Sequence, residues 1–183
     1  MIMQYERVIP NPNGYSRDRY HFRQDVWRVF RRLYPSMTFE KQPFAFALDG
    51  SRIVVRSTLP FDGAVHVPNT KNVGDSCVVV IDLCPTTQSN GKERSIPIED
   101  RKGNITYLAK ELAKAGMEIA DEAGVEYVSL GACAYQRGKR VPIFAVRFMA
   151  TVRIVDSNAC SKGCFEGVST SKRFLGFGMP ILF

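Results

Sequence analysis

The fold of this chain is decided by the stretch SRDRYHFRQDVWRVFRRLYP, residues 16–35. Apolar side chains recur in it at the three-to-four-residue spacing of one helix face. They are Phe22, Val26, Val29, Phe30 and Leu33. Ser16 or Asp18 can cap the amino end, and Pro35 closes the segment because its ring cannot continue a helix. We therefore predict an amphipathic helix whose apolar stripe belongs to the core.

Segments with the composition of strands surround this helix. They are residues 3–9, 44–48, 52–58 and 77–83, with a further hairpin that runs through Ser89-Asn90-Gly91 to Ile98. The pair at 44–58 is separated by Asp49-Gly50-Ser51, which indicates a hairpin with a short loop. Residues 77–83 are a continuous β-branched run, typical of a strand buried on both faces.

The second half begins with a predicted helix at residues 104–115, which Gly116 ends. Strands are predicted at 126–134, 143–155 and 177–183, with a short helix at 157–165. This order fits an α+β fold of two ferredoxin-like modules in tandem, residues 1–99 and 100–183. One larger α+β domain is the alternative.

Charge indicates the class of partner. Lysine and arginine outnumber aspartate and glutamate by 25 to 18, so the net charge is +7 and the pI is about 9.3. Such an excess is the electrostatic footprint of a polyanion binder, although many basic proteins bind no polyanion. No stretch approaches the ~18 consecutive apolar residues of a membrane span, so we expect no membrane partner and a soluble, cytoplasmic protein.

No metal or cofactor is expected. The five cysteines contain no CxxC pair, and only two histidines are present to complete a metal site. Cys160 and Cys164 are four residues apart, but such a pair is more often two small buried hydrophobes than a pair of ligands. No hydrolase elbow, zinc-hydrolase motif or dinucleotide fingerprint occurs.

Three segments combine cations with the groups that nucleic acids require. The glycine-rich segment 167–178 holds Ser171, Lys172 and Arg173 and can offer amides and charge to phosphates, unless it is a turn with solvated cations. A basic loop at residues 136–140 carries Arg137, Lys139 and Arg140. The first helix carries a second stripe, predicted to lie away from the apolar face, that could stack bases or simply be solvated. It consists of Tyr20, Arg23, Trp27 and Arg31.

Histidine narrows the chemistry further. Cutting RNA without metal requires proton transfer at the 2′-hydroxyl and the 5′-oxygen, and stabilisation of a phosphorane. Histidine is the residue type whose ordinary pKa lies near neutral pH, and the sequence has two, His21 and His66, of which His66 is expected to have a structural role.

Taken together, these segments resemble the CasE-type endoribonucleases that process CRISPR precursor RNA. The resemblance rests on Ser16-Arg17-Asp18-Arg19-Tyr20 with the helix that follows, on the residues from Val73-Gly74-Asp75 to Gly116-Met117, and on the glycine-rich segment. The ending Met179-Pro180-Ile181-Leu182-Phe183 resembles the related Csy-type group. The resemblance implies two ferredoxin-like modules that hold a CRISPR repeat hairpin. It also implies cleavage at the 3′ base of the stem to a 2′,3′-cyclic phosphate, and a product-bound enzyme that joins other effector-complex subunits.

The sequence departs from this family at one catalytic position. The family's first-helix tyrosine is followed three residues later by its catalytic histidine, whereas Tyr20 is followed at that spacing by Arg23, and His21 comes two positions early. We expect His21 or Tyr20 to transfer protons, and Arg23 and Lys172 to stabilise the phosphorane. RNA contacts are expected from Trp27, Arg31, Arg137, Lys139, Arg140, Ser171 and Arg173. The alternative is a hairpin-binding subunit of a surveillance complex that has lost cleavage.

Overall fold

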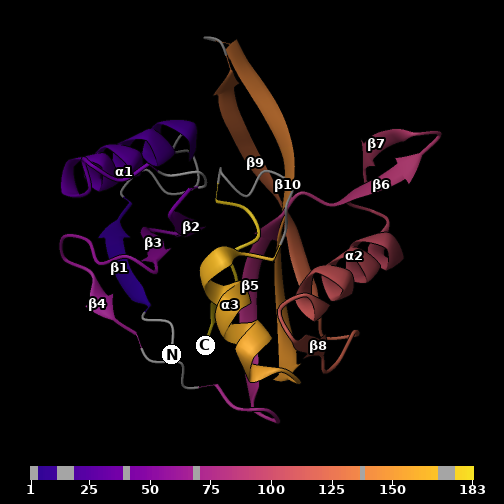
Figure 1. The fold of residues 1–183 in the computed structure, drawn as a ribbon. Coiled ribbons are helices and arrows are strands. Elements are labelled where there is room, and N and C mark those ends of the chain that lie inside the picture. Colours follow the sequence, from indigo (N-terminus) through magenta and orange to yellow (C-terminus); the bar gives the residue numbers. More distant parts are fainter. Residues whose placement is uncertain (1–3, 12–18, 39–41, 68–70, 137–138, 169–175) are drawn as a thin grey trace.

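The computed structural model describes residues 4–11, 19–38, 42–67, 71–136, 139–168 and 176–183, with the backbone alone for 132–136 and 139–141. Two antiparallel sheets lie side by side, with α1 on the left-hand sheet and α3 and the C-terminus between the two (Figure 1). β9 and β10 extend beyond the rest of the molecule as a two-stranded ribbon (Figure 1).

The first module has ferredoxin-like topology. It consists of β1 (Tyr5–Pro10), α1 (Arg19–Leu33), β2 (Phe44–Asp49), β3 (Arg52–Ser57) and β4 (Val65–His66). Its antiparallel strands have the order β2-β3-β1-β4, so β1 and β2 are connected through α1 and lie on either side of β3. This is the split β-α-β arrangement. An irregular connection at residues 58–64 stands where that fold has its second helix.

The second module repeats this order. It consists of β5 (Ser76–Leu83), β6 (Thr86–Ser89), β7 (Lys92–Ser95), α2 (Arg101–Ala113), β8 (Met117–Ile119), β9 (Glu126–Gln136), β10 (Lys139–Ile154), α3 (Ser157–Glu166) and β11 (Ile181–Leu182). The sheet runs β11-β5-β10, and β8 and β9 share the other edge of β10. Hairpin β6–β7 is an insertion before α2.

The structure confirms the predicted α+β class with its two ferredoxin-like modules, and most elements lie within a few residues of their expected bounds. β5 pairs with β10 and β11, so residues 76–83 belong to the sheet of the second module. The boundary at residue 99, as a division between folding units, stays a prediction. The strand expected at 177–183 is wrong in extent, since only Ile181–Leu182 pairs.

The predicted helix stripe forms the core of the first module. Phe22 meets Phe46 edge to face at 5.0 Å between ring centroids, and Phe30 stacks on Phe44 at 5.3 Å. The opposite face of the same sheet is also covered. There the small side chains of Ala45 and Ala47 pack in one cluster with Met179 and Ile181 of the C-terminal segment. The C-terminal segment therefore lies between the two modules.

The second core lies between β5, β10 and the two helices α2 and α3. Val79 and Ile81 of β5 pack there with Leu108 and Leu112 of α2. The buried run predicted at residues 77–83 thus forms the centre of this core. One residue of the run, Asp82, breaks its apolar character.

Asp82 joins the modules through a buried ion network. Its Oδ2 accepts from Arg19 Nη2 at 2.7 Å, and its Oδ1 accepts from Arg147 Nε at 2.7 Å. The side chains of Asp82 and Arg19 are only 2% and 3% exposed, so both charges depend on this pairing. Arg147 also donates to the Leu48 carbonyl of β2. One carboxylate therefore connects α1 and β2 of the first module to β5 and β10 of the second.

We predict that Asp82→Asn lowers the free energy of unfolding by about 3–5 kcal/mol, because removing one partner leaves two arginines in an uncompensated buried site. Urea denaturation measures this loss. Asp25→Asn is the matched control, since the Asp25–Arg28 pair is exposed and such pairs contribute about 0–1 kcal/mol. Equal stability of the two variants would show that the modules do not depend on Asp82.

Candidate nucleic-acid interface

The first turn of α1 is bound to the end of the glycine-rich segment. Arg19 Nη1 donates to the Gly176 carbonyl at 3.0 Å, and its guanidinium lies 4.1 Å from the centroid of the Phe177 ring. The Val168 amide donates to the Gly178 carbonyl at 2.7 Å, which closes the base of the segment. Ser171, Lys172 and Arg173, expected to contact RNA, lie between these two ends and outside the described residues.

Tyr20 packs against this junction, whereas the neighbouring His21 is exposed. Tyr20 is half-buried against a cluster that includes Phe177 and Ile143. His21 is exposed, with its ring 6.3 Å from that of Tyr20. Because α1 is helical from Arg19 onward, His21 lies about 200° around the axis from Arg23. The departure seen in the sequence is therefore a difference in the direction that the imidazole faces.

Arg23 lies on the side of α1 opposite to His21, where a hydrogen bond holds its guanidinium. Its Nε donates to Gln42 Oε1 at 2.8 Å, and Gln42 Nε2 donates in turn to the Phe44 carbonyl at 2.8 Å. Burial lowers the pKa of Arg23, while an ionised Tyr20 nearby raises it. A guanidinium stays protonated at neutral pH under such changes. Arg23 is thus a fixed positive charge close to the Tyr20 hydroxyl.

Trp27, in the same predicted stripe of α1, is more buried than the sequence predicts. Trp27 is half-buried and meets Phe44 at 5.6 Å between ring centroids, and Arg31 covers the indole at 5.4 Å. The expectation that the stripe lies away from the apolar face is wrong at Trp27. Its neighbour Phe30, three residues on, shares the same side of the helix. RNA contacts by Trp27 and Arg31 stay a prediction.

Ribbon β9–β10 carries the predicted basic loop to its end. The strands pair as far as Gln136 and Lys139, so the loop is shorter than the five residues expected. Lys139 and Arg140 belong to β10, although their side chains are not described, and Arg137 lies outside the described residues. Cations at the end of a projecting two-stranded ribbon can meet the phosphates of a nucleic-acid backbone.

The second histidine and the Cys160–Cys164 pair pack against other parts of the protein. His66 lies in β4, and its ring meets Tyr5 edgewise at 6.0 Å. Cys160 and Cys164 are buried, and the hydrogen bond between their side chains, together with burial, raises the pKa of Cys164 well above its usual value. Within the described ranges, no three histidine, cysteine, aspartate or glutamate side chains gather where they could hold a metal ion. No described helix is long and apolar enough to cross a membrane.

Sequence reasoning missed Arg19, Asp82 and Arg147. A signal for two of them was present, because Asp82 interrupts the apolar run at residues 77–83 and Arg147 interrupts the apolar run at residues 143–150. A charge in such a strand is retained only when it is paired. The partner of each charge could not be identified from the sequence, since Asp82 and Arg147 are 65 residues apart.

Comparison with solved structures places this geometry among known folds. Thermus thermophilus Cse3, in a structure with an RNA representing a pre-cleavage complex, matches with a TM-score of 0.73 over 100% of both chains at 14% identity. The fold is that of the CRISPR endoribonuclease Cse3. Cas6e from Escherichia coli K-12 matches with a TM-score of 0.68 and 19% identity over 98% of both chains. No family model and no curated protein sequence matches this chain.

A third match comes from an assembly. A chain of Escherichia coli Cascade bound to a PAM-containing double-stranded DNA target has a TM-score of 0.58 and 17% identity, covering 100% of this chain and 98% of that one. The likeness to the Cas6e fold therefore spans both modules.

Gly176 offers a test of how closely the glycine-rich segment meets the first module. Its φ is +79°, and a Cβ there would overlap the Phe46 ring. We predict that Gly176→Ala lowers the free energy of unfolding by about 1–3 kcal/mol more than Gly74→Ala, because it adds overpacking to backbone strain. Gly74 is the matched control, with a φ of +94° and nothing within 4 Å of its added Cβ. Equal losses in chemical denaturation would contradict this packing.

Proposed function

We propose that this chain is a metal-independent endoribonuclease that binds CRISPR repeat hairpins and cleaves precursor RNA at the 3′ base of the stem. One observation carries the proposal: Arg19 binds the Gly176 carbonyl and so holds Tyr20 beside the base of the glycine-rich segment. Supporting it is a fold shared with the CRISPR endoribonuclease Cse3, which has been solved with RNA bound, and with the CRISPR-associated protein Cas6e.

The chemistry needs three groups around one phosphate. A base removes the proton of the 2′-hydroxyl, the O2′–P bond forms as the P–O5′ bond breaks, and an acid protonates the departing 5′-oxygen. Tyr20 or His21 supplies the proton transfers. Arg23 and Lys172 supply positive charge to the phosphorane, which carries more negative charge than the ground state. The products are a 2′,3′-cyclic phosphate and a free 5′-hydroxyl.

RNA binding is attributed to the cations around this junction and along the ribbon. The net charge of +7 favours a polyanion, and Lys139 and Arg140 enter β10 at the projecting end of the ribbon. The A-form major groove is deep and narrow, so the stem is expected to be read through its backbone and shape. Arg31, Arg173 and Trp27 are the further candidates for contacts to phosphates and bases.

The chain is also proposed to keep its product and to join other subunits of an effector complex. The support is the match to a chain of Escherichia coli Cascade, which covers both modules.

The catalytic assignment predicts the effect of two substitutions. Wild-type protein is expected to cleave its own repeat hairpin in EDTA, and Tyr20→Phe and His21→Ala to slow single-turnover cleavage by about 10²–10⁴-fold. His66→Ala, the control histidine, should leave the rate unchanged. Unchanged cleavage by His21→Ala would remove His21 from the mechanism, and the same result for Tyr20→Phe would remove Tyr20.

A second candidate function is a hairpin-binding subunit without cleavage. Arg23 at the family's histidine spacing and the outward direction of His21 favour it. The same assay separates the two functions. Binding of the hairpin at physiological salt without cyclic-phosphate product would establish the subunit and exclude the enzyme.

Phosphate contacts from the ribbon predict a change in salt dependence. Replacing Lys139 and Arg140 together by glutamine should weaken hairpin binding and reduce the slope of log K against log salt by about 0.7–0.9 for each phosphate that is no longer neutralised. Arg28→Gln is the control, since Arg28 is exposed on α1 and paired with Asp25. A slope equal to that of the control, measured by titration at several salt concentrations, would remove the ribbon from the RNA interface.

A further inference from the structure

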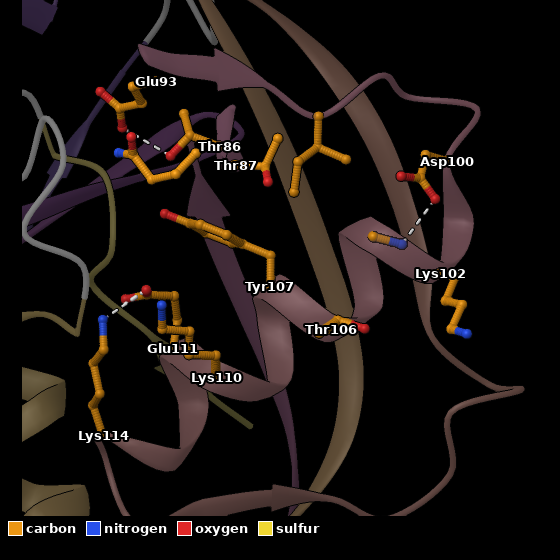
Figure 2. A pocket seen from close by; sticks show the side chains of 13 residues that line it. Thr86, Thr87, Glu93, Asp100, Lys102, Thr106, Tyr107, Lys110, Glu111 and Lys114 are labelled. Atoms are coloured by element: carbon orange, nitrogen blue, oxygen red, sulfur yellow. Dashed lines mark hydrogen bonds and ion pairs between the residues drawn. The ribbon is translucent and has the colours of Figure 1, made fainter. Parts of the chain in front are cut away.

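A polar groove lies on the side of the second module that is away from α1. It runs between hairpin β6–β7 and α2 and has a volume of about 770 Å³, which is within the range of ligand sites (Figures 1 and 2). Thr86, Thr87 and Gln88 line the hairpin side. Tyr107, Lys110 and Glu111 line the helix side, and Figure 2 shows the Tyr107 ring reaching from α2 into the space beneath the hairpin.

Glu111 is a buried carboxylate with one oxygen still to be satisfied. Its side chain is 5% exposed, and Oε1 accepts from Lys114 Nζ at 2.6 Å. Oε2 is buried and has no hydrogen-bond partner among the described residues. An unsatisfied buried acceptor is costly, more so when it is charged. A donor from a bound ligand would satisfy this oxygen and remove that cost.

The groove around Glu111 favours one kind of donor. Tyr107 offers an aromatic face, and bases stack on such faces with little dependence on sequence. Lys102 and Lys110 are exposed on the same helix and line the same groove, where they can meet phosphates. An aromatic face, an acceptor and two cations together are the set that a nucleotide requires.

The carboxylate also distinguishes among bases. Guanine presents two adjacent N–H donors on its Watson–Crick edge, N1–H and N2–H, and a carboxylate can accept both with paired charge-assisted bonds. On that edge, the only donor of adenine and of cytosine is an amino group, and the only donor of uracil is one ring N–H. Guanine is therefore the base that best satisfies Glu111.

We propose that this groove binds a guanine nucleotide in a single-stranded RNA segment. Glu111 accepts from N1–H and N2–H, Tyr107 stacks on the base, and Lys110 or Lys102 meets a neighbouring phosphate. This site is separate from the proposed cleavage junction, so it adds a contact for RNA that leaves the hairpin stem and does not itself cut.

The test uses a labelled hexamer of uridine that contains one guanosine, compared with hexamers containing inosine or adenosine at that position. Inosine lacks only the N2 amino group, so the comparison changes the ligand and leaves the protein intact. By fluorescence anisotropy at physiological salt, the guanosine hexamer is expected to bind about tenfold more tightly than either analogue. Glu111→Gln should abolish this preference, because an amide presents only one acceptor oxygen. Glu118→Gln, an exposed control on β8, should keep it.

Three results would overturn the proposal. The first is equal affinity for all three hexamers, and the second is a guanosine preference that survives Glu111→Gln. The third is competition by free GMP that is as effective as competition by the hexamer, because the ligand would then be a free nucleotide. Tyr107→Leu should weaken all hexamers alike, and loss of the guanosine preference alone would contradict its stacking role. Cleavage of a stem-only hairpin reports on the proposed nuclease function separately, and Glu111→Gln should leave its rate unchanged.

Discussion

The carboxylate of Asp82 is the group on which the arrangement of the two modules depends. Arg19 from α1 and Arg147 from β10 both bind it in a site that excludes water, where an unpaired charge would be strongly unfavourable. The Asp82 carbonyl also accepts from the Gly178 amide, so the same residue fixes the end of the glycine-rich segment. Helix, segment and central strand thus meet at one point, and the candidate site is a consequence of that meeting. Arg56 adds a second link, from β3 to the carbonyls of Cys164 and Pro180.

Much of the fold could be predicted from the sequence because its elements are periodic over a long enough stretch. The apolar spacing from Phe22 to Leu33 is confirmed as α1, and Asp49-Gly50-Ser51 is confirmed as the turn of a hairpin. The last strand was overestimated for a physical reason. Residues 176–180 are apolar because they pack between the modules, with Phe177 beneath Arg19 and Met179 against the first sheet, and not because they pair in a sheet.

The candidate site was predictable only where its chemistry is local. Tyr20 and His21 are neighbours in sequence, so helical geometry gives their directions, and the difference of about 200° between His21 and Arg23 follows from the sequence alone. The enclosure of Trp27 and the bond from Arg23 to Gln42 depend on β2 and the residues before it, which no local pattern reveals. The same holds for the groove beneath β6–β7. Glu111 looks like an ordinary helix-surface residue in the sequence, but its side chain is only 5% exposed in the fold.

The proposed cleavage requires the scissile phosphate to lie where α1 meets the base of the glycine-rich segment. A crystal structure with the cognate repeat hairpin, carrying a 2′-deoxy substitution that removes the attacking hydroxyl, is the decisive measurement. We expect the scissile phosphate within hydrogen-bond reach of the Tyr20 hydroxyl, beside Phe177, with the ribbon along the stem. A hairpin bound with that phosphate away from Tyr20, on the exposed side of α1 or on another face of the molecule, would contradict this assignment.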